Sequence, residues 1–212
     1  LRSILSIIES GCFILAFRFM SLADAHSIGA SVPIMVVVLA VILLKEEVNK
    51  KILASIFVGF VGVLIIMRPG LTVFDNKSLI ALSGAFFVSL YLIITRIVSK
   101  YDQNETSLFF SGLIGIILMG LASLFYWEPI TIKFLPMFIG IGFFYSIAAY
   151  FHIIALSKAR ASIIQPFHYT LIFWAIIFGY IFYGDFPDSF TIIGSIIIAL
   201  SGIYVFRIQN ND

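Results

Sequence analysis

The chain has 212 residues, of which 61% are hydrophobic and 11% are charged, and its mean hydropathy is +1.12. Soluble domains carry about 25% charged residues, so the composition excludes an ordinary soluble domain and predicts an all-α polytopic membrane protein. The net charge of +2 gives no reason to expect a nucleic-acid partner, and the single cysteine excludes an internal disulfide.

Apolar stretches of the length that a membrane-spanning helix needs, roughly 20 residues, recur along the whole chain. Short polar connections separate them and leave no room for a soluble domain. We therefore predict about eight transmembrane helices in a lipid bilayer. In chain order they cover residues 3–20, 26–44, 51–67, 78–98, 106–126, 134–156, 161–183 and 189–207.

Two parts of the chain repeat one order of features. Residues 17–68 and 151–207 each contain a proline early in an apolar stretch, Pro33 in the first and Pro166 in the second. Each copy then has a charged loop and a final apolar stretch with spaced glycines. Matching features lie about 133 to 140 residues apart. This spacing predicts two structural repeats.

The loops of the two copies carry opposite charge. Residues 45–51 include three lysines, whereas residues 184–188 include two aspartates, Asp185 and Asp188. The hinge of the first copy contains Asp24, whereas its counterpart contains lysine and arginine. Because basic loops stay cytoplasmic, the repeats should have opposite orientation, as in many secondary transporters. Counting lysine and arginine loop by loop places both ends of the chain in the cytoplasm.

The copies are unequal in length. Two apolar stretches, 78–98 and 106–126, precede the second copy, and none precede the first. We therefore expect a protein of ten helices that is seen here without its first two. Residues 1–70 would be the last three helices of the first repeat, and residues 71–212 the five helices of the second.

Several short motifs occur in a familiar order. They are Lys45-Glu46-Glu47, the run from Gly59 to Gly70 that ends in Arg-Pro-Gly, and Gln165-Pro166-Phe167-His168-Tyr169. The chain resembles the EamA-type transporters of the drug/metabolite transporter superfamily, most closely the subgroup with S-adenosylmethionine uptake carriers. The resemblance implies a carrier of small polar or amphipathic metabolites in a bacterial inner membrane. Lys45-Glu46-Glu47 departs from the usual Gly-Glu, and Glu9 stands where a small or apolar residue is usual.

Glu9 is the sharpest candidate for a functional residue. It lies about two turns into the first apolar stretch, roughly 10 Å from its start at 1.5 Å per residue. A carboxylate at that depth costs a few kcal/mol, so it should face a cavity, have a partner or be protonated. The functional interpretation is a cation or proton site, or a contact for a substrate amine. The alternative is a protonated glutamic acid bonded to a neighbouring hydroxyl.

The stretch from 161 to 183 has the richest polar face. Gln165, His168 and Tyr169 are spaced i, i+3 and i+4 and so share one side of a helix. Pro166 removes a backbone donor and can leave a carbonyl free. We expect the substrate pathway between this stretch and the one containing Pro33. The alternative is that these polar groups join helices to one another.

Aromatic and histidine side chains form further candidate walls. Tyr145 and His152 share a face of the stretch from 134 to 156, and Tyr91 lies in the stretch from 78 to 98. Aromatic rings with a hydroxyl suit a cationic or amphipathic solute. Trp174 lies in the middle of its stretch, away from the usual interfacial belt. For each of these residues, packing or lipid contact is the competing interpretation.

Other prominent residues receive structural interpretations. Glu46, Glu47 and Asp185 should cap the next helix or pair with lysines. Arg68 and Arg96 should reach toward lipid headgroups. The glycines at 59, 62, 194 and 202 should allow close helix approach.

These patterns predict a secondary transporter of a small polar or cationic metabolite, such as an amino acid or S-adenosylmethionine, that works by alternating access. A membrane-embedded enzyme and a truncated product without transport activity are the alternatives. The sequence has no Gly-x-x-x-x-Gly-Lys-Ser/Thr loop for ATP and no His-Glu-x-x-His motif, and we expect no cofactor or metal. Faces of small residues would also suit a homodimer.

Overall fold

The computed structural model describes residues 1–20, 22–68, 77–125, 131–184 and 188–211. All regular elements within these ranges are helices, which confirms the all-α prediction. In chain order they are α1 (Arg2–Phe19), α2 (Leu22–Gly29), α3 (Val32–Leu44), α4 (Lys50–Met67), α5 (Ser78–Val98), α6 (Asn104–Ser123), the 3₁₀ helix η2 (Ile132–Phe134), α7 (Leu135–Lys158), α8 (Ala161–His168), α9 (Thr170–Tyr183) and α10 (Ser189–Asn211).

Two of the predicted stretches are each divided into two helices. The stretch from 26 to 44 is interrupted between α2 and α3, where Pro33 lies in the first turn of α3 and costs no internal hydrogen bond. The stretch from 161 to 183 is interrupted at Tyr169, because Pro166 lies inside α8 and cannot donate to the preceding turn. The prediction of continuous helices is wrong at these two points.

Four helical segments of the described chain are long and apolar enough to cross a membrane on their own, namely Lys50–Met67, Ser78–Val98, Asn104–Ser123 and Ile132–Lys158. The shorter apolar segments Val32–Leu44 and Ser189–Tyr204 belong with them in composition. Together these helices form an integral membrane bundle.

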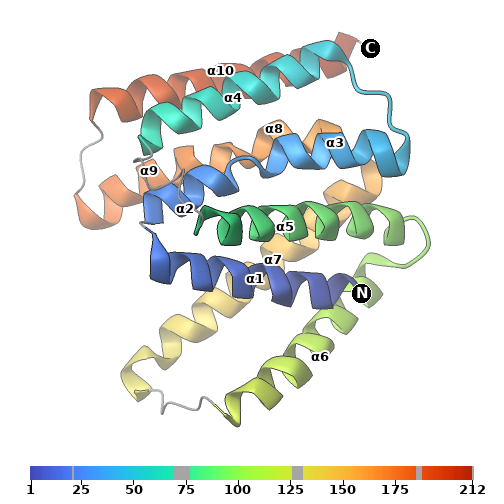
Figure 1. The fold of residues 1–212 in the computed structure, drawn as a ribbon, viewed down its shortest axis with the longest axis vertical. Coiled ribbons are helices and arrows are strands. Elements are labelled where there is room, and N and C mark those ends of the chain that lie inside the picture. Colours follow the sequence, from blue (N-terminus) through green and yellow to red (C-terminus); the bar gives the residue numbers. More distant parts are fainter. Residues whose placement is uncertain (21, 69–76, 126–130, 185–187, 212) are drawn as a thin grey trace.

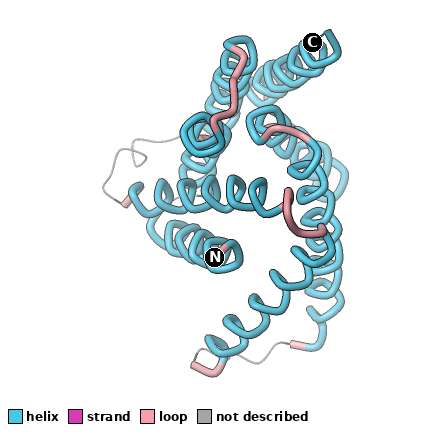
Figure 2. Tube along the Cα trace, turned by 90° about the vertical axis from the view of Figure 1, so that its right-hand side faces the viewer, coloured by secondary structure: helices cyan, strands magenta, loops and turns pink. Residues whose placement is uncertain are grey.

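The helices pack in a definite order. α4 and α10 run side by side at one end of the bundle, and α1 lies along α5 nearer the other end (Figure 1). The short helix α8 lies between these pairs and contacts α3, α4, α5, α7 and α10. α6 and α7 pack on each other and extend away from the rest of the bundle (Figure 2).

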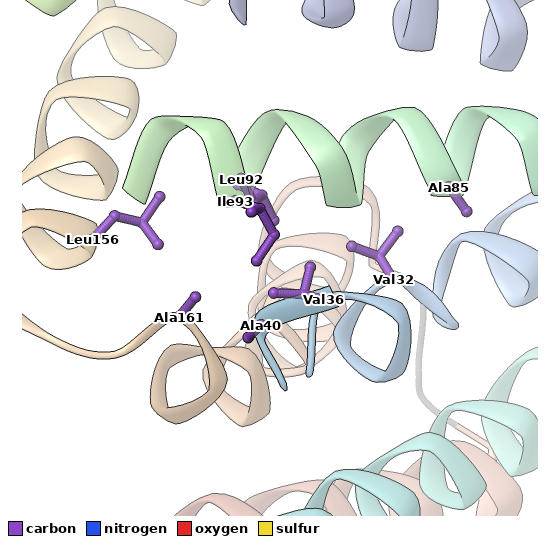
Figure 3. Packing of buried hydrophobic residues seen from close by; sticks show 8 residues of the cluster. All are labelled: Val32, Val36, Ala40, Ala85, Leu92, Ile93, Leu156 and Ala161. Atoms are coloured by element: carbon purple, nitrogen blue, oxygen red, sulfur yellow. The ribbon is translucent and has the colours of Figure 1, made fainter. Parts of the chain in front are cut away.

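The main core lies where α3, α5, α7 and α8 meet (Figure 3). Alanines at this junction are fully buried and let the helix backbones approach closely. Larger side chains fill the space between them. The buried cluster consists of Val32, Val36, Ala40, Ala85, Leu92, Ile93, Leu156 and Ala161.

Glycines set the contact between α4 and α10. A Cβ on Gly194 would lie 2.7 Å from the carbonyl oxygen of Gly62, and one on Gly59 would lie 2.5 Å from the ring of Tyr169. The prediction of close helix approach is confirmed at Gly59, Gly62 and Gly194. It is wrong at Gly202 as far as the described residues go, since none of them lies within 4 Å of a Cβ placed there.

Arg96 joins two helices instead of reaching toward lipid. Its Nη1 donates to the carbonyl oxygens of Leu156 at 2.5 Å and Ser157 at 2.9 Å, in the last turn of α7. These carbonyls have no partner within their own helix, and a cation there is favourable. The prediction of a headgroup anchor is therefore wrong for Arg96.

Arg68 forms an ion pair with Asp188, which precedes α10, and lies 5.0 Å from the ring centroid of Phe190. Hydrogen bonds from Thr191 and then the neighbouring Arg68 lower the pKa of the Asp188 carboxyl to about 2. Asp188 thus keeps its charge at neutral pH and ties the end of α4 to the start of α10. The predicted opposite charge of the two repeats rests partly on Asp24 and Asp185. The side chains of both lie outside the described residues.

The two charged loops begin with the same backbone conformation. Lys45 after α3 has φ 52°, and Gly184 after α9 has φ 73°, both in the left-handed region that favours glycine. Lysine therefore occupies in the first loop the position that glycine occupies in the second. Where the usual Gly-Glu motif has glycine, this chain thus has Lys45 in a backbone conformation that favours glycine.

Glu46 caps a helix distant in sequence. Its carboxylate accepts hydrogen bonds from the backbone N–H of Ala161 at 3.1 Å and of Ser162 at 3.3 Å, and from the Ser162 hydroxyl at 2.9 Å. The next helix, α4, is capped by Asn49 instead, which accepts from the N–H of Lys51 at 2.9 Å. The prediction that Glu46 caps the next helix is therefore wrong, because Glu46 caps α8.

Replacing Glu46 with glutamine should lower the free energy of unfolding by about 1 kcal/mol, because a charged acceptor at a helix N-terminus is lost. The adjacent Glu47→Gln variant is the matched control. The side chain of Glu47 is exposed, so its replacement should change stability by less than about 0.5 kcal/mol. Unfolding in detergent measures the change in the free energy of unfolding for each variant. Equal effects of the two variants would contradict the capping role.

Candidate functional site

A cavity of about 460 Å³ lies between α1, α5, α6 and α7. Two of the predicted site residues, Tyr91 and Tyr145, line it from α5 and α7. Hydroxyl groups come from serines on three of the four helices, and the remaining wall is apolar. The other lining residues are Ser3, Ser6, Ile7, Leu108, Ser111, Gly112, Gly115, Met119, Ser146, Ala149 and Ile153.

Glu9 stands beside this cavity. It is half-buried on α1, one turn from Ser6, which lines the cavity, and on the same face of that helix. Tyr91 and Tyr145 thus line the cavity, and Glu9 lies next to its α1 wall. A carboxylate next to two phenol rings is suited to a cation, which is attracted by the charge and by the ring faces.

The hydrogen bonding of Glu9 is weak. Ser10 Oγ lies 3.4 Å from Glu9 Oε1 but only 2.9 Å from the carbonyl oxygen of Ser6. A serine hydroxyl has one proton to donate, so the carbonyl receives the better bond. Within the described residues Glu9 forms no ion pair. The Glu9 carboxylate can therefore still accept hydrogen bonds and pair with a cation.

His152 and His168 form a second group. Their ring centroids are 5.3 Å apart with an interplanar angle of 62°. Among the described residues, His152 Nε2 is buried without a hydrogen-bond partner. The same holds for Oε1 of the fully buried Gln165, whose Nε2 donates to the carbonyl of Ala161 at 3.0 Å. The α7 residues Tyr145, Ala149 and His152 are spaced i, i+4 and i+7, so one face of α7 leads from the cavity to the histidine pair.

Tyr169 is placed apart from Gln165 and His168. It is 3% exposed, its ring packs on Gly59 of α4, and its hydroxyl donates to the carbonyl oxygen of Ala30 at 3.1 Å. Tyr169 stands at the interruption between α8 and α9, and Ala30 at the one between α2 and α3. One hydrogen bond therefore joins the two broken helices at their break points.

Trp174 is also separate from the cavity. Its side chain is 52% exposed and lines an apolar groove of about 410 Å³ between α9 and α10. The groove residues are otherwise Phe167, Thr170, Ile198, Ala199, Gly202 and Ile203. The structure thus places Trp174 at a surface of the kind that meets lipid acyl chains.

Arg2 and the serines near it were missed by the sequence reasoning. Arg2 is 8% exposed, and its Nη2 donates to the carbonyl oxygen of Ser107 and the hydroxyl of Ser111 on α6. Arg2, Ser6 and Glu9 are spaced i, i+4 and i+7, which puts them on one face of α1. This polar stripe on an otherwise apolar helix is the signal that could have found Arg2.

Metal binding has no support in the described residues, because they contain no group of three or more histidine, cysteine or acidic side chains placed to hold an ion. The polar groups that line the cavity are phenol and serine hydroxyl, and the Glu9 carboxylate and the Arg2 guanidinium lie on α1 next to lining residues of that helix. They can bind a charged organic solute by ion pairing and hydrogen bonding.

Comparisons with known proteins agree with this architecture. The sequence profile of the EamA-like transporter family matches residues 1–68 and 77–207. A solved crystal structure that is 16% identical has the same fold, with a TM-score of 0.83 over 99% of this chain and 76% of that one.

Similar curated proteins are named as transporters. An uncharacterized transporter of Helicobacter pylori (strain J99) is 31% identical over 94% of this chain and 71% of its own length. An S-adenosylmethionine uptake transporter of Rickettsia bellii is 26% identical over 85% of this chain and 62% of its own. A pseudopaline exporter of Pseudomonas aeruginosa is 22% identical over 97% of this chain and 73% of its own length. The chain therefore belongs to the EamA-like transporter family, and it is an integral membrane protein.

Proposed function

We propose that this chain carries a small metabolite with a cationic group across a bacterial inner membrane, and that the cavity between α1, α5, α6 and α7 binds it. The observation that carries the proposal is the half-buried Glu9 carboxylate next to the α1 wall of the cavity that Tyr91 and Tyr145 line. A charged group among membrane helices is costly, and a bound cation would offset that cost. The cavity of about 460 Å³ is within the usual range for small-molecule sites.

Alternating access is the mechanism that the helix arrangement favours. The helix pairs α2/α3 and α8/α9 are each interrupted, and discontinuous helices border the binding sites of many secondary transporters. We propose that residues 1–70 and 71–212 belong to two repeats of opposite orientation, with the lysine loop at 45–51 on the cytoplasmic side. Rocking of one repeat against the other would expose the cavity to each side in turn.

Gln165, His168 and His152 extend this proposal. The His152–His168 contact lies one turn along α7 from the cavity wall, so a proton or a polar part of the solute would reach it from the cavity. Tyr169 serves as a joint between the broken helices, because its hydroxyl bonds the other break. Trp174 would take part only if the solute passed along the face of α9.

Transport into membrane vesicles tests this function. Uptake and efflux of a panel of amino acids, S-adenosylmethionine and amines are measured with and without a pH gradient. The proposal predicts saturable transport of at least one cationic member, with neutral analogues of similar size transported at least about 10-fold less well. A folded protein that transports no cationic member would overturn it.

A further inference from the structure

We propose that Arg2 and Ser107 form a binding site for an oxyanion next to the cavity, so that the transported solute carries a carboxylate as well as a cation. This inference rests on the proposed transport function and narrows its substrate to a zwitterion. The two charges of such a solute would be bound at two points along α1, the carboxylate near Arg2 at its start and the cation near Glu9 two turns further on.

The Arg2 guanidinium is only partly satisfied by the protein. Its Nη2 donates to the carbonyl oxygen of Ser107 and to Ser111 Oγ, but its buried Nη1 has no partner among the described residues. The hydroxyl of Ser107 is also buried without a partner. Because the Ser107 carbonyl is bonded to the same guanidinium, two unused donors lie next to each other.

No carboxylate of the described residues forms an ion pair with Arg2. Within the part of the chain that the structure describes, the one ion pair is between Arg68 and Asp188. Arg2 is 8% exposed, and a buried charge is costly unless it is paired and hydrogen-bonded. A carboxylate would provide the missing charge, and its two oxygens would accept from Arg2 Nη1 and the Ser107 hydroxyl.

The site is connected to the cavity through serines. Ser111 accepts from Arg2, and its own hydroxyl proton is donated to the Ser107 carbonyl at 2.8 Å. Ser111 lines the cavity, as do Ser3 and Ser6 on the first turns of α1. An anion held at Arg2 would therefore be part of a solute in the cavity.

The spacing along α1 defines the kind of zwitterion. Arg2 and Glu9 are seven residues apart, which is two turns and about 10 Å along the helix axis. The solute should therefore have its carboxylate and its cation several bonds apart, as in lysine or S-adenosylmethionine.

A lipid phosphate has the same oxyanion chemistry and is the other source to distinguish. Lipid bound at Arg2 would respond to membrane composition and would not distinguish one solute from another. The cavity position of Ser111 and the burial of Arg2 favour the solute.

The test compares solutes that differ only in the carboxylate. The dissociation constants of lysine and cadaverine, and of S-adenosylmethionine and its decarboxylated form, are measured for the purified protein in vesicles of neutral lipid and of 30% anionic lipid, on the order of a typical cytoplasmic leaflet. The wild type should bind the carboxylated member of a pair about 10- to 100-fold more tightly. Arg2→Gln should remove that preference and leave the decarboxylated member unchanged.

The Arg18→Gln variant is the matched control, because Arg18 is an exposed arginine at the other end of α1. It should retain the wild-type preference. Ser107→Ala, which keeps the Arg2 charge, should reduce the preference several-fold and provides a second reading if Arg2→Gln does not fold.

Equal losses for both members of a pair would show a structural brace at Arg2 and overturn the inference. An effect that depends on lipid composition and not on the solute would assign the site to lipid phosphate and overturn it as well. Wild-type binding of cadaverine with no preference for lysine would also overturn it and leave the proposed function standing. Binding of none of the four solutes would count against the proposed function itself.

Discussion

Replacing Glu9 with glutamine should weaken the binding of cationic solutes about 10- to 100-fold, because a hydrogen bond or ion pair to a charged group contributes about 1.5–3 kcal/mol. The variant keeps the size of the side chain and removes its charge. The dissociation constant of a transported cation, measured in vesicles, reports the change. The binding of neutral solutes should stay the same.

Glu105→Gln provides the control for Glu9. Glu105 is an exposed carboxylate in the first turn of α6, where its Oε1 accepts from the Tyr150 hydroxyl at 2.9 Å. Removing this charge should leave cation affinity unchanged. If both variants lost affinity equally, surface charge and not the cavity would account for cation binding.

Replacing Gly194 with alanine should destabilise the protein by about 1–2 kcal/mol. A Cβ there would meet the Gly62 carbonyl oxygen at 2.7 Å, and backbone cannot move aside at low cost. Overpacking costs about 1–3 kcal/mol, of which the better helix propensity of alanine recovers up to about 1 kcal/mol. Reversible unfolding in mixed detergent micelles measures the difference.

Gly202→Ala is the matched substitution on the same helix. A Cβ at Gly202 would meet nothing within 4 Å, so only the propensity gain remains. This variant should be as stable as the wild type or more stable by up to about 1 kcal/mol. Destabilisation of both variants to the same extent would contradict the close contact between α4 and α10.

Much of the helix pattern could be predicted because hydropathy acts locally. Apolar length alone predicted residues 78–98 and 51–67 to within one residue of α5 and α4. The interruptions at residue 30 and at Tyr169 depend on contacts with distant helices, such as the hydrogen bond between the Tyr169 hydroxyl and the Ala30 carbonyl. A single sequence contains no direct sign of that bond.

The candidate site could be predicted only in part. Tyr91 and Tyr145 line one cavity, and Glu9 stands beside it, because helical spacing brought each to an inner face. Tyr169 falls one residue after the end of α8, and its hydroxyl donates to the carbonyl oxygen of Ala30 at the break between α2 and α3. A local spacing rule cannot detect a partner that lies 139 residues away in the chain.

The burial of Arg2 is the clearest feature of the site that local sequence patterns could not predict. Basic residues at the end of an apolar stretch usually mark the membrane surface, so its position in the sequence predicted a loop charge. Its burial follows from hydrogen bonds to Ser107 and Ser111, which are 105 and 109 residues away in the chain. Only the packing of α1 against α6 reveals it.

Occupation of the cavity by the transported solute can be measured by thiol labelling. Ser146→Cys places a thiol in the cavity wall, Glu47→Cys places one in the exposed loop between α3 and α4, and both are made in a Cys12→Ser background. A membrane-impermeant thiol reagent should label the Ser146→Cys variant, and a saturating cationic substrate should slow that labelling about 10-fold. The substrate should not change the labelling of the Glu47→Cys variant. Labelling at position 146 that is unaffected by a solute which the same protein transports would contradict the assignment of this cavity as the substrate site.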